Sequence, residues 1–103
     1  MRFLVKVTFP VEAGNEAARA GTLGETIGRI LEEQKPEAAY FFAQDGERGG
    51  IIILDMESAD QIPAIAEPWF LALDASIEIQ PVMTPEDLQK AGPSIAKAVQ
   101  TFG

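Results

Sequence analysis

The side chains that could carry out proton transfer are few in this sequence. It contains no histidine and no cysteine, which removes the commonest general base, the usual zinc and copper ligands and the thiolate nucleophile. A serine–histidine–aspartate triad is excluded on the same ground. Proton transfer would have to use a carboxylate, Tyr40 or Lys6, and the last two are the candidate catalytic residues.

Ligand binding would draw on aromatic and cationic side chains. Tyr40 and Trp69 each carry a polar group on a large apolar side chain, so both could line an apolar pocket. Core packing is the alternative, and for Trp69, which follows Pro68, the two roles are balanced. Arg29 or Arg19 could hold an anionic group, although for any one arginine a solvated surface position is the commoner outcome.

Two glycines, Gly24 and Gly28, lie one turn apart in a helical segment, where each costs roughly 1 kcal/mol relative to alanine. Tight packing on a sheet, or a helix break, is the favoured explanation; the competing one is room for a ligand between helix and sheet. Neither a phosphate-binding loop nor a dinucleotide fingerprint is present. The acidic residues after position 54 lack the spacing of a calcium loop. We therefore expect no cofactor and no metal.

The charge of the chain argues against nucleic-acid and membrane partners. Sixteen acidic and eight basic residues give a net charge of −8, and the basic residues are scattered. Such a surface repels phosphate backbones and anionic lipids. The longest aliphatic run, from Ile51 to Leu54, is far shorter than the roughly 20 residues that span a bilayer. With no cysteine and no signal-like start, the sequence predicts a soluble, cytoplasmic protein.

The periodicity of the chain predicts one α+β domain over residues 1–103. Its expected elements are a strand at 2–9, a helix at about 15–35 that breaks at Gly21 and restarts at Thr22, strands at 38–43 and 50–56 joined by an Asp-Gly turn, a short helix from Ser58 that breaks at Pro68, and a strand at 75–82. Residues 84–103 form a helical tail. This order is that of the ferredoxin-like βαββαβ fold, a four-stranded antiparallel sheet with helices on one face. If the strand at 75–82 pairs beside the first strand, Lys6 and Glu78 can form a cross-strand pair.

A second copy of the chain is the expected partner. Residues 50–56 are apolar on both faces of their strand, yet the helices of this fold cover only one face. Leaving the other face in water would forgo about 1.5–3 kcal/mol for each large side chain, so a second sheet is the natural cover. The alternative is that the tail, with Ile95, Ala98, Val99 and Phe102 at helical spacing, folds back over the sheet.

Several segments resemble a known superfamily. They are the opening strand Met1–Val7, the run from Gly49 to Ser58, and Pro68-Trp-Phe ahead of the strand Ile77–Pro81. Together they are similar to the dimeric α/β-barrel superfamily, and within it to small muconolactone-isomerase-like proteins, over about residues 1–82. The resemblance implies a homodimer or higher homo-oligomer with a cleft between sheet and helices, in a group that includes isomerases, cyclases and cofactor-independent monooxygenases.

Two functions remain open at this point. The first is a cofactor-independent isomerase-like or cyclase-like enzyme acting on a small apolar, aromatic or lactone compound. The alternative is a noncatalytic dimer that binds a small ligand or serves as an accessory protein. The candidate ligand-binding residues for either function are Gly24, Gly28, Arg29, Tyr40 and Trp69.

Overall fold

Four alternating segments build a sheet in a computed structural model that describes residues 1–103. The strands are β1 (Arg2–Phe9), β2 (Ala38–Gln44), β3 (Glu47–Asp55) and β4 (Ser76–Pro81). They pair antiparallel in the order β2-β3-β1-β4, with β1 and β3 at the centre. The expected ferredoxin-like α+β fold is confirmed.

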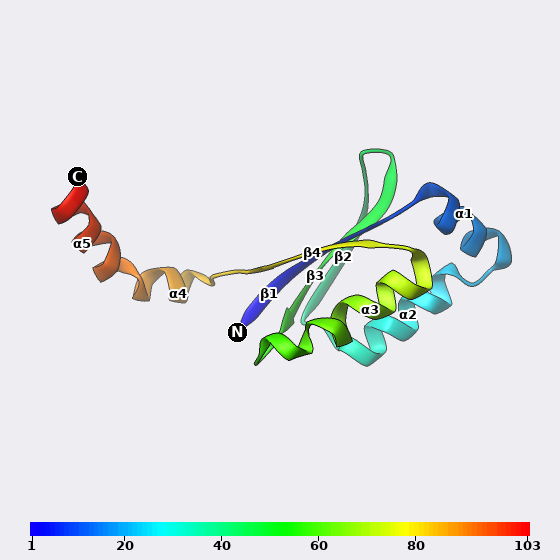
Figure 1. The fold of residues 1–103 in the computed structure, drawn as a ribbon, viewed down its shortest axis with the longest axis horizontal. Coiled ribbons are helices and arrows are strands. Elements are labelled where there is room, and N and C mark those ends of the chain that lie inside the picture. Colours follow the sequence, from blue (N-terminus) through cyan, green and yellow to red (C-terminus); the bar gives the residue numbers. More distant parts are fainter.

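The helices divide into two groups. The elements are α1 (Val11–Ala20), α2 (Leu23–Gln34), the 3₁₀ turn η1 (Ala59–Gln61), α3 (Ile62–Leu73), α4 (Pro85–Lys90) and α5 (Gly92–Phe102). Helices α1 to α3 lie on one side of the sheet, whereas α4 and α5 extend beyond its end (Figure 1). We call the side under α1 to α3 the covered face and the other side the open face. None of the helices combines the length and apolar character needed to cross a membrane.

The predicted break between two helices is confirmed, but its details differ. Gly21 takes a left-handed conformation, with φ of 75°, and caps α1. Thr22 precedes α2 without capping it, because its hydroxyl donates to the Ala17 carbonyl at 3.3 Å. The first helix also begins at Val11, earlier than expected, with Gly14 inside it. At Gly14 a Cβ would lie 2.5 Å from the Arg48 guanidinium, so the glycine makes room for that side chain.

The expected break at Pro68 is wrong, since α3 runs through it to Leu73. A proline inside a helix removes one backbone donor and leaves the carbonyl four residues earlier without its partner. That carbonyl belongs to Ala64, which is exposed, so water can hydrogen-bond it. The predicted helix start at Ser58 is confirmed, because Gln61 Oε1 accepts a hydrogen bond from the Ser58 N–H at 3.2 Å. Pro63 lies within the first turn of α3, where a proline is tolerated.

The core fills the space between the covered face and helices α2 and α3. Its most buried large side chains are Trp69, Ile52, Leu73, Val5 and Val7. The Trp69 indole donates to Gln34 Oε1 at 3.4 Å, and the Gln34 amide donates to the Ile65 carbonyl at 2.8 Å. Gln34 therefore gives the buried indole an acceptor and joins α2 to α3.

Residues 83–103, here named the arm, lie apart from this body. The expected helical tail is confirmed as α4 and α5, but the arm does not fold back over the sheet (Figure 1). The molecule measures 59 × 28 × 20 Å and has a radius of gyration of 17.3 Å. A compact chain of this length has a radius of gyration of about 13 Å. The open face is therefore left uncovered by its own chain.

Candidate functional site

The open face carries both candidate catalytic residues in one row. Tyr40 on β2 lies opposite Ile51 on β3, Ile51 lies opposite Lys6 on β1, and Lys6 lies opposite Glu78 on β4. Because neighbouring strands are about 4.8 Å apart, Tyr40 and Lys6 are separated by about 10 Å, with Ile51 between them. The predicted pairing of Lys6 with Glu78 is confirmed in register, although their charged groups form no ion pair.

Two further rows flank this one and give the open face two unlike halves. Along β2-β3-β1-β4 they are Ala38, Ile53, Leu4 and Gln80 on one side, and Phe42, Gly49, Thr8 and Ser76 on the other. Apolar side chains gather over β2 and β3, and polar ones over β1 and β4. The Tyr40 side chain is 65% exposed. The face thus presents a broad apolar area beside a row of hydrogen-bonding groups.

A polar hollow of about 170 Å³ lies at the hairpin end of the open face. Lys6, Thr8, Ser76 and Glu78 line it from β1 and β4, and residues 44, 45 and 47 line it from the β2–β3 hairpin. One ammonium group here meets three carboxylates, those of Glu78, Asp45 and Glu47. The hollow therefore suits hydrogen bonding to a neutral polar group better than binding of an anion.

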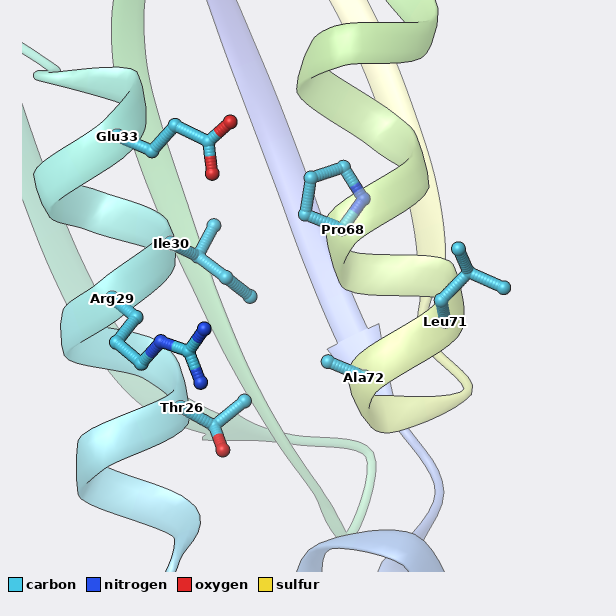
Figure 2. Close-up of a pocket in the computed structure, with 7 residues that line it drawn as sticks. All are labelled: Thr26, Arg29, Ile30, Glu33, Pro68, Leu71 and Ala72. Atoms are coloured by element: carbon cyan, nitrogen blue, oxygen red, sulfur yellow. The ribbon is translucent and has the colours of Figure 1, made fainter.

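A second hollow, the interhelical groove, lies between α2 and α3 on the outer side of the molecule. Its volume is about 360 Å³, within the range of small-molecule sites. Figure 2 shows Thr26, Arg29, Ile30 and Glu33 along α2, with Pro68 and Ala72 facing them from α3. Arg29 and Glu33 are one turn apart, so both charges line the same groove, although they form no ion pair.

The structure scatters the predicted ligand-binding residues instead of bringing them together. Only Arg29 lines the interhelical groove, and only Tyr40 lies on the open face. Trp69 is fully buried and hydrogen-bonded to Gln34, which places it in the core. Neither Tyr40 nor Trp69 lines any of the five main surface hollows.

Gly24 and Gly28 are exposed on α2, and a Cβ at either position would meet nothing within 4 Å. Close packing on the sheet therefore does not explain them, and neither does room for a ligand beneath the helix. Of the other arginines, Arg19 is exposed in α1, and Arg48 donates to Asn15 Oδ1 at 3.0 Å.

Several residues of these surfaces were not predicted from the sequence. Thr26, Ile30 and Glu33 stand with Arg29 at the i, i+3, i+4, i+7 spacing that marks one side of a helix. That spacing could have identified one wall of the interhelical groove. The opposite wall could not be identified, because α3 was expected to end at Pro68.

Charged residues are concentrated where β4 leads into the arm. The Arg2 guanidinium forms two hydrogen bonds with Glu37, and this carboxylate raises the pKa of Arg2 above its ordinary value. The Thr84 backbone N–H donates to Asp87 Oδ2 at 3.0 Å, and the Thr84 hydroxyl accepts from the Asp87 N–H at 3.1 Å. These hydrogen bonds, first the one from the backbone, lower the pKa of Asp87. The Thr84–Asp87 pair stabilises the start of α4, at the base of the arm.

Comparison with protein families assigns the chain to one family. The model of a family described as "Domain of unknown function (DUF3303)" matches residues 1–96. The chain belongs to this family. The match extends over the whole sheet, α1 to α3 and part of the arm, so the open face and the interhelical groove both lie within the DUF3303 domain. A search of curated proteins gave no match.

Solved structures resemble the fold of this DUF3303 chain. One is a formyltetrahydrofolate deformylase from Pseudomonas putida KT2440, with 16% identity and a TM-score of 0.50 over 80% of this chain and 29% of that one. The de novo designed protein Ferredog-Diesel has 10% identity and a TM-score of 0.46, over 79% of this chain and 85% of that one. This chain spans less than a third of the deformylase, and that likeness supports the fold alone.

Proposed function

We propose that this protein is a homodimer that binds a small, largely apolar ligand against the open face of its sheet. The observation that carries the proposal is the row Tyr40–Ile51–Lys6–Glu78, in which an apolar half of the face meets a polar half. Ligand sites are concave and are lined mostly by apolar side chains, with a few placed polar groups. The open face has this composition.

Burial of apolar surface favours the dimer. The open face leaves Tyr40 and Phe42 exposed and Ile51 and Ile53 half-buried. Removing such side chains from water contributes about 1.5–3 kcal/mol for each one fully buried. Two sheets pack about 10 Å apart, a spacing that side chains from both faces fill. A ligand lying between the two open faces would be enclosed on both sides.

The polar half of the open face indicates the chemistry of the ligand. Lys6 and Tyr40 are donors on either side of the apolar Ile51. A compound with an aromatic or lactone ring and one carbonyl oxygen could place the ring on Ile51 and accept a hydrogen bond from one donor. No cofactor is part of this proposal, and a cytoplasmic location stays a prediction.

Thermal unfolding of the full chain with small lactones, phenols and carboxylic acids tests this function. A binder at one hundred times its Kd raises the apparent stability by about 2.7 kcal/mol. We expect one of these classes to stabilise the wild type, with the shift reduced in Tyr40→Phe or Lys6→Met. Arg29→Gln, in the interhelical groove, is the matched control and should keep the shift. A shift lost only in the Arg29 variant would move the site to the groove and refute the proposal.

A second candidate, a cofactor-independent isomerase or cyclase similar to the muconolactone-isomerase-like proteins, is favoured by one observation. Lys6 and Glu78 lie directly opposite each other on adjacent strands, which gives one proton donor and one acceptor in a single row. Turnover of the ligand that is lost in Glu78→Gln while binding is kept would support the enzyme. Binding without turnover in the wild type would support the noncatalytic role.

A further inference from the structure

The arm carries an apolar stripe that its own chain leaves bare. Ile95, Val99 and Phe102 lie at i, i+4 and i+7 on α5, and are 53%, 62% and 88% exposed. This spacing places them on one side of the helix, the arrangement of a helix that docks into a groove through anchor residues. The opposite side of α5 carries Lys97 and Gln100.

The accessible surface of the chain is too large for a self-contained monomer. It amounts to 7108 Å², whereas a compact monomer of this size exposes about 5,700 Å². The excess of about 1,400 Å² for each chain is close to 3,000 Å² for a pair. Interfaces of obligate dimers bury about 2,000–5,000 Å² in total. The surplus therefore matches the area that a permanent partner of the same kind would bury.

The charges of the arm also suit a second copy. The arm has two acidic residues, Glu86 and Asp87, and two basic ones, Lys90 and Lys97, so the whole net charge of −8 belongs to residues 1–82. Helix α5 contains Lys97 and no acidic residue. Residues 1–82 of two copies repel each other, because each carries a net charge of −8. The arm has no net charge, so it can approach residues 1–82 of another copy without repulsion.

An apolar groove of about 340 Å³ between α3 and the edge strand β4, here named the edge groove, is the best surface for this helix. Its hydrophobic lining residues are Ile62, Ala66, Phe70, Ile77 and Ile79. The carboxylate of Glu67 adds a negative charge at the same groove, and α5 brings no acidic residue against it. We propose that α5 of each chain docks into the edge groove of a second copy, so that two chains exchange their arms.

The base of the arm directs it away from its own edge groove. The Val82 N–H donates to the Arg2 carbonyl at 3.0 Å, which continues the line of β4 past its last ladder residue. Thr84 is extended, with φ of −77° and ψ of 167°, and its capping box with Asp87 starts α4 at the next residue, Pro85. The arm thus leaves along the strand direction, away from the sheet (Figure 1).

The first test measures the dimer by sedimentation equilibrium of the full chain. We expect Val99→Asp to raise the Kd of the dimer at least about tenfold, because it places a charge in an apolar contact. Gln100→Asp adds the same charge on the other side of α5 and should leave the Kd unchanged. Since both residues are exposed in a single chain, both variants should keep the wild-type circular dichroism spectrum.

The second test uses the absence of native cysteine to distinguish exchange from fold-back. The double variant Phe70→Cys/Val99→Cys is treated with a short bis-maleimide linker and run on a denaturing gel. Exchange produces covalent dimers, whereas an arm folded into its own edge groove produces monomers joined internally. Phe70→Cys/Gln100→Cys is the control and should give far less of either product. Internally joined monomers, or no product, would overturn the proposal.

Different experimental results would contradict the arm exchange and the ligand site on the open face. A dimer that survives Val99→Asp but dissociates in Phe42→Lys would show that the sheets alone hold two copies together, and would overturn arm exchange. A dimer lost in Val99→Asp with ligand binding also lost would support exchange and make it a requirement of the site. Ligand binding by a Val99→Asp monomer would leave exchange intact and refute an enclosed site between two sheets.

Discussion

The two faces of this sheet differ in how completely they are buried, although the same strands build both. Ile52 on the covered face is fully buried, while its neighbours Ile51 and Ile53 on the open face are only half-buried. Strand geometry sends successive side chains to opposite faces, so three identical residues in a row sample both environments. The difference shows that α2 and α3 supply enough cover for one face and none for the other.

Replacing these isoleucines one at a time is the most direct test of the difference between the two faces. Ile52→Ala should reduce the free energy of unfolding by about 2–5 kcal/mol, because it leaves a cavity in the core. Ile51→Ala and Ile53→Ala should reduce the free energy of unfolding by less than Ile52→Ala does in dilute protein. Urea unfolding at several protein concentrations measures both. Equal losses at all three positions would mean that the open face is as well packed as the covered one.

A second change tests how the helical cover is held. Gln34→Leu should cost about 1–3 kcal/mol, because the buried Trp69 indole loses its acceptor. Glu32→Leu, at an exposed position of the same helix, is the control and should stay within about 0.5 kcal/mol of the wild type. Urea unfolding followed by Trp69 fluorescence reports both. An unchanged Gln34 variant would show that packing alone keeps α2 beside α3.

Glycine substitutions compare the open outer surface of α2 with the crowded surface of the sheet. Gly28→Ala should stabilise the protein by about 0.5–1 kcal/mol, since the new methyl group enters open space on α2. Gly50→Ala should destabilise it, because a Cβ there would lie 2.8 Å from a ring carbon of Phe41. Thermal unfolding compares the two. A destabilised Gly28→Ala would point to a contact at this surface that one chain does not show.

The smallest expected effect concerns the base of the arm. The folded-state pKa of Asp87 is lowered by its hydrogen bonds with Thr84, so this carboxylate stabilises α4 above its ordinary pKa. That stabilisation is lost as the pH falls through the lowered value. NMR signals of residues in α4 should report fraying at acid pH before the sheet unfolds. Asp87→Asn should show no such step, and a step that persists in this variant would assign it to another group.

Much of the fold could be predicted from the sequence because strand alternation and turn residues are local signals. The alternation at residues 2–9 and the Asp-Gly turn place the central strands, and the fold then fixes which strands are neighbours. That is why Lys6 could be paired with Glu78 in advance. Antiparallel pairing turns one local period into contacts between distant segments.

The candidate site was harder to predict because solvent exposure is not a local property. Pro68 suggested a helix end, yet α3 continues where an exposed carbonyl can be hydrated. The expected break at Pro68 is why the role of Trp69 stayed balanced between core packing and pocket lining. Gly24 and Gly28 suggested a close contact, but both lie in open space. A sequence does not distinguish a glycine in open space from one that is packed against a neighbouring element. Solvent exposure decided both cases, that of the Ala64 carbonyl and that of the outer surface of α2.

The position of β1 at the centre of the sheet has a consequence for synthesis of the chain. β1 is translated before both of its neighbours, β3 and β4, and its last partner is Pro81. Until that point the ribosome holds a strand with apolar Val5 and Val7 that cannot complete its pairing. Such long-range pairing is slow and leaves nascent chains prone to aggregation. Holdase chaperones should therefore recognise the opening strand on stalled nascent chains that end before β4.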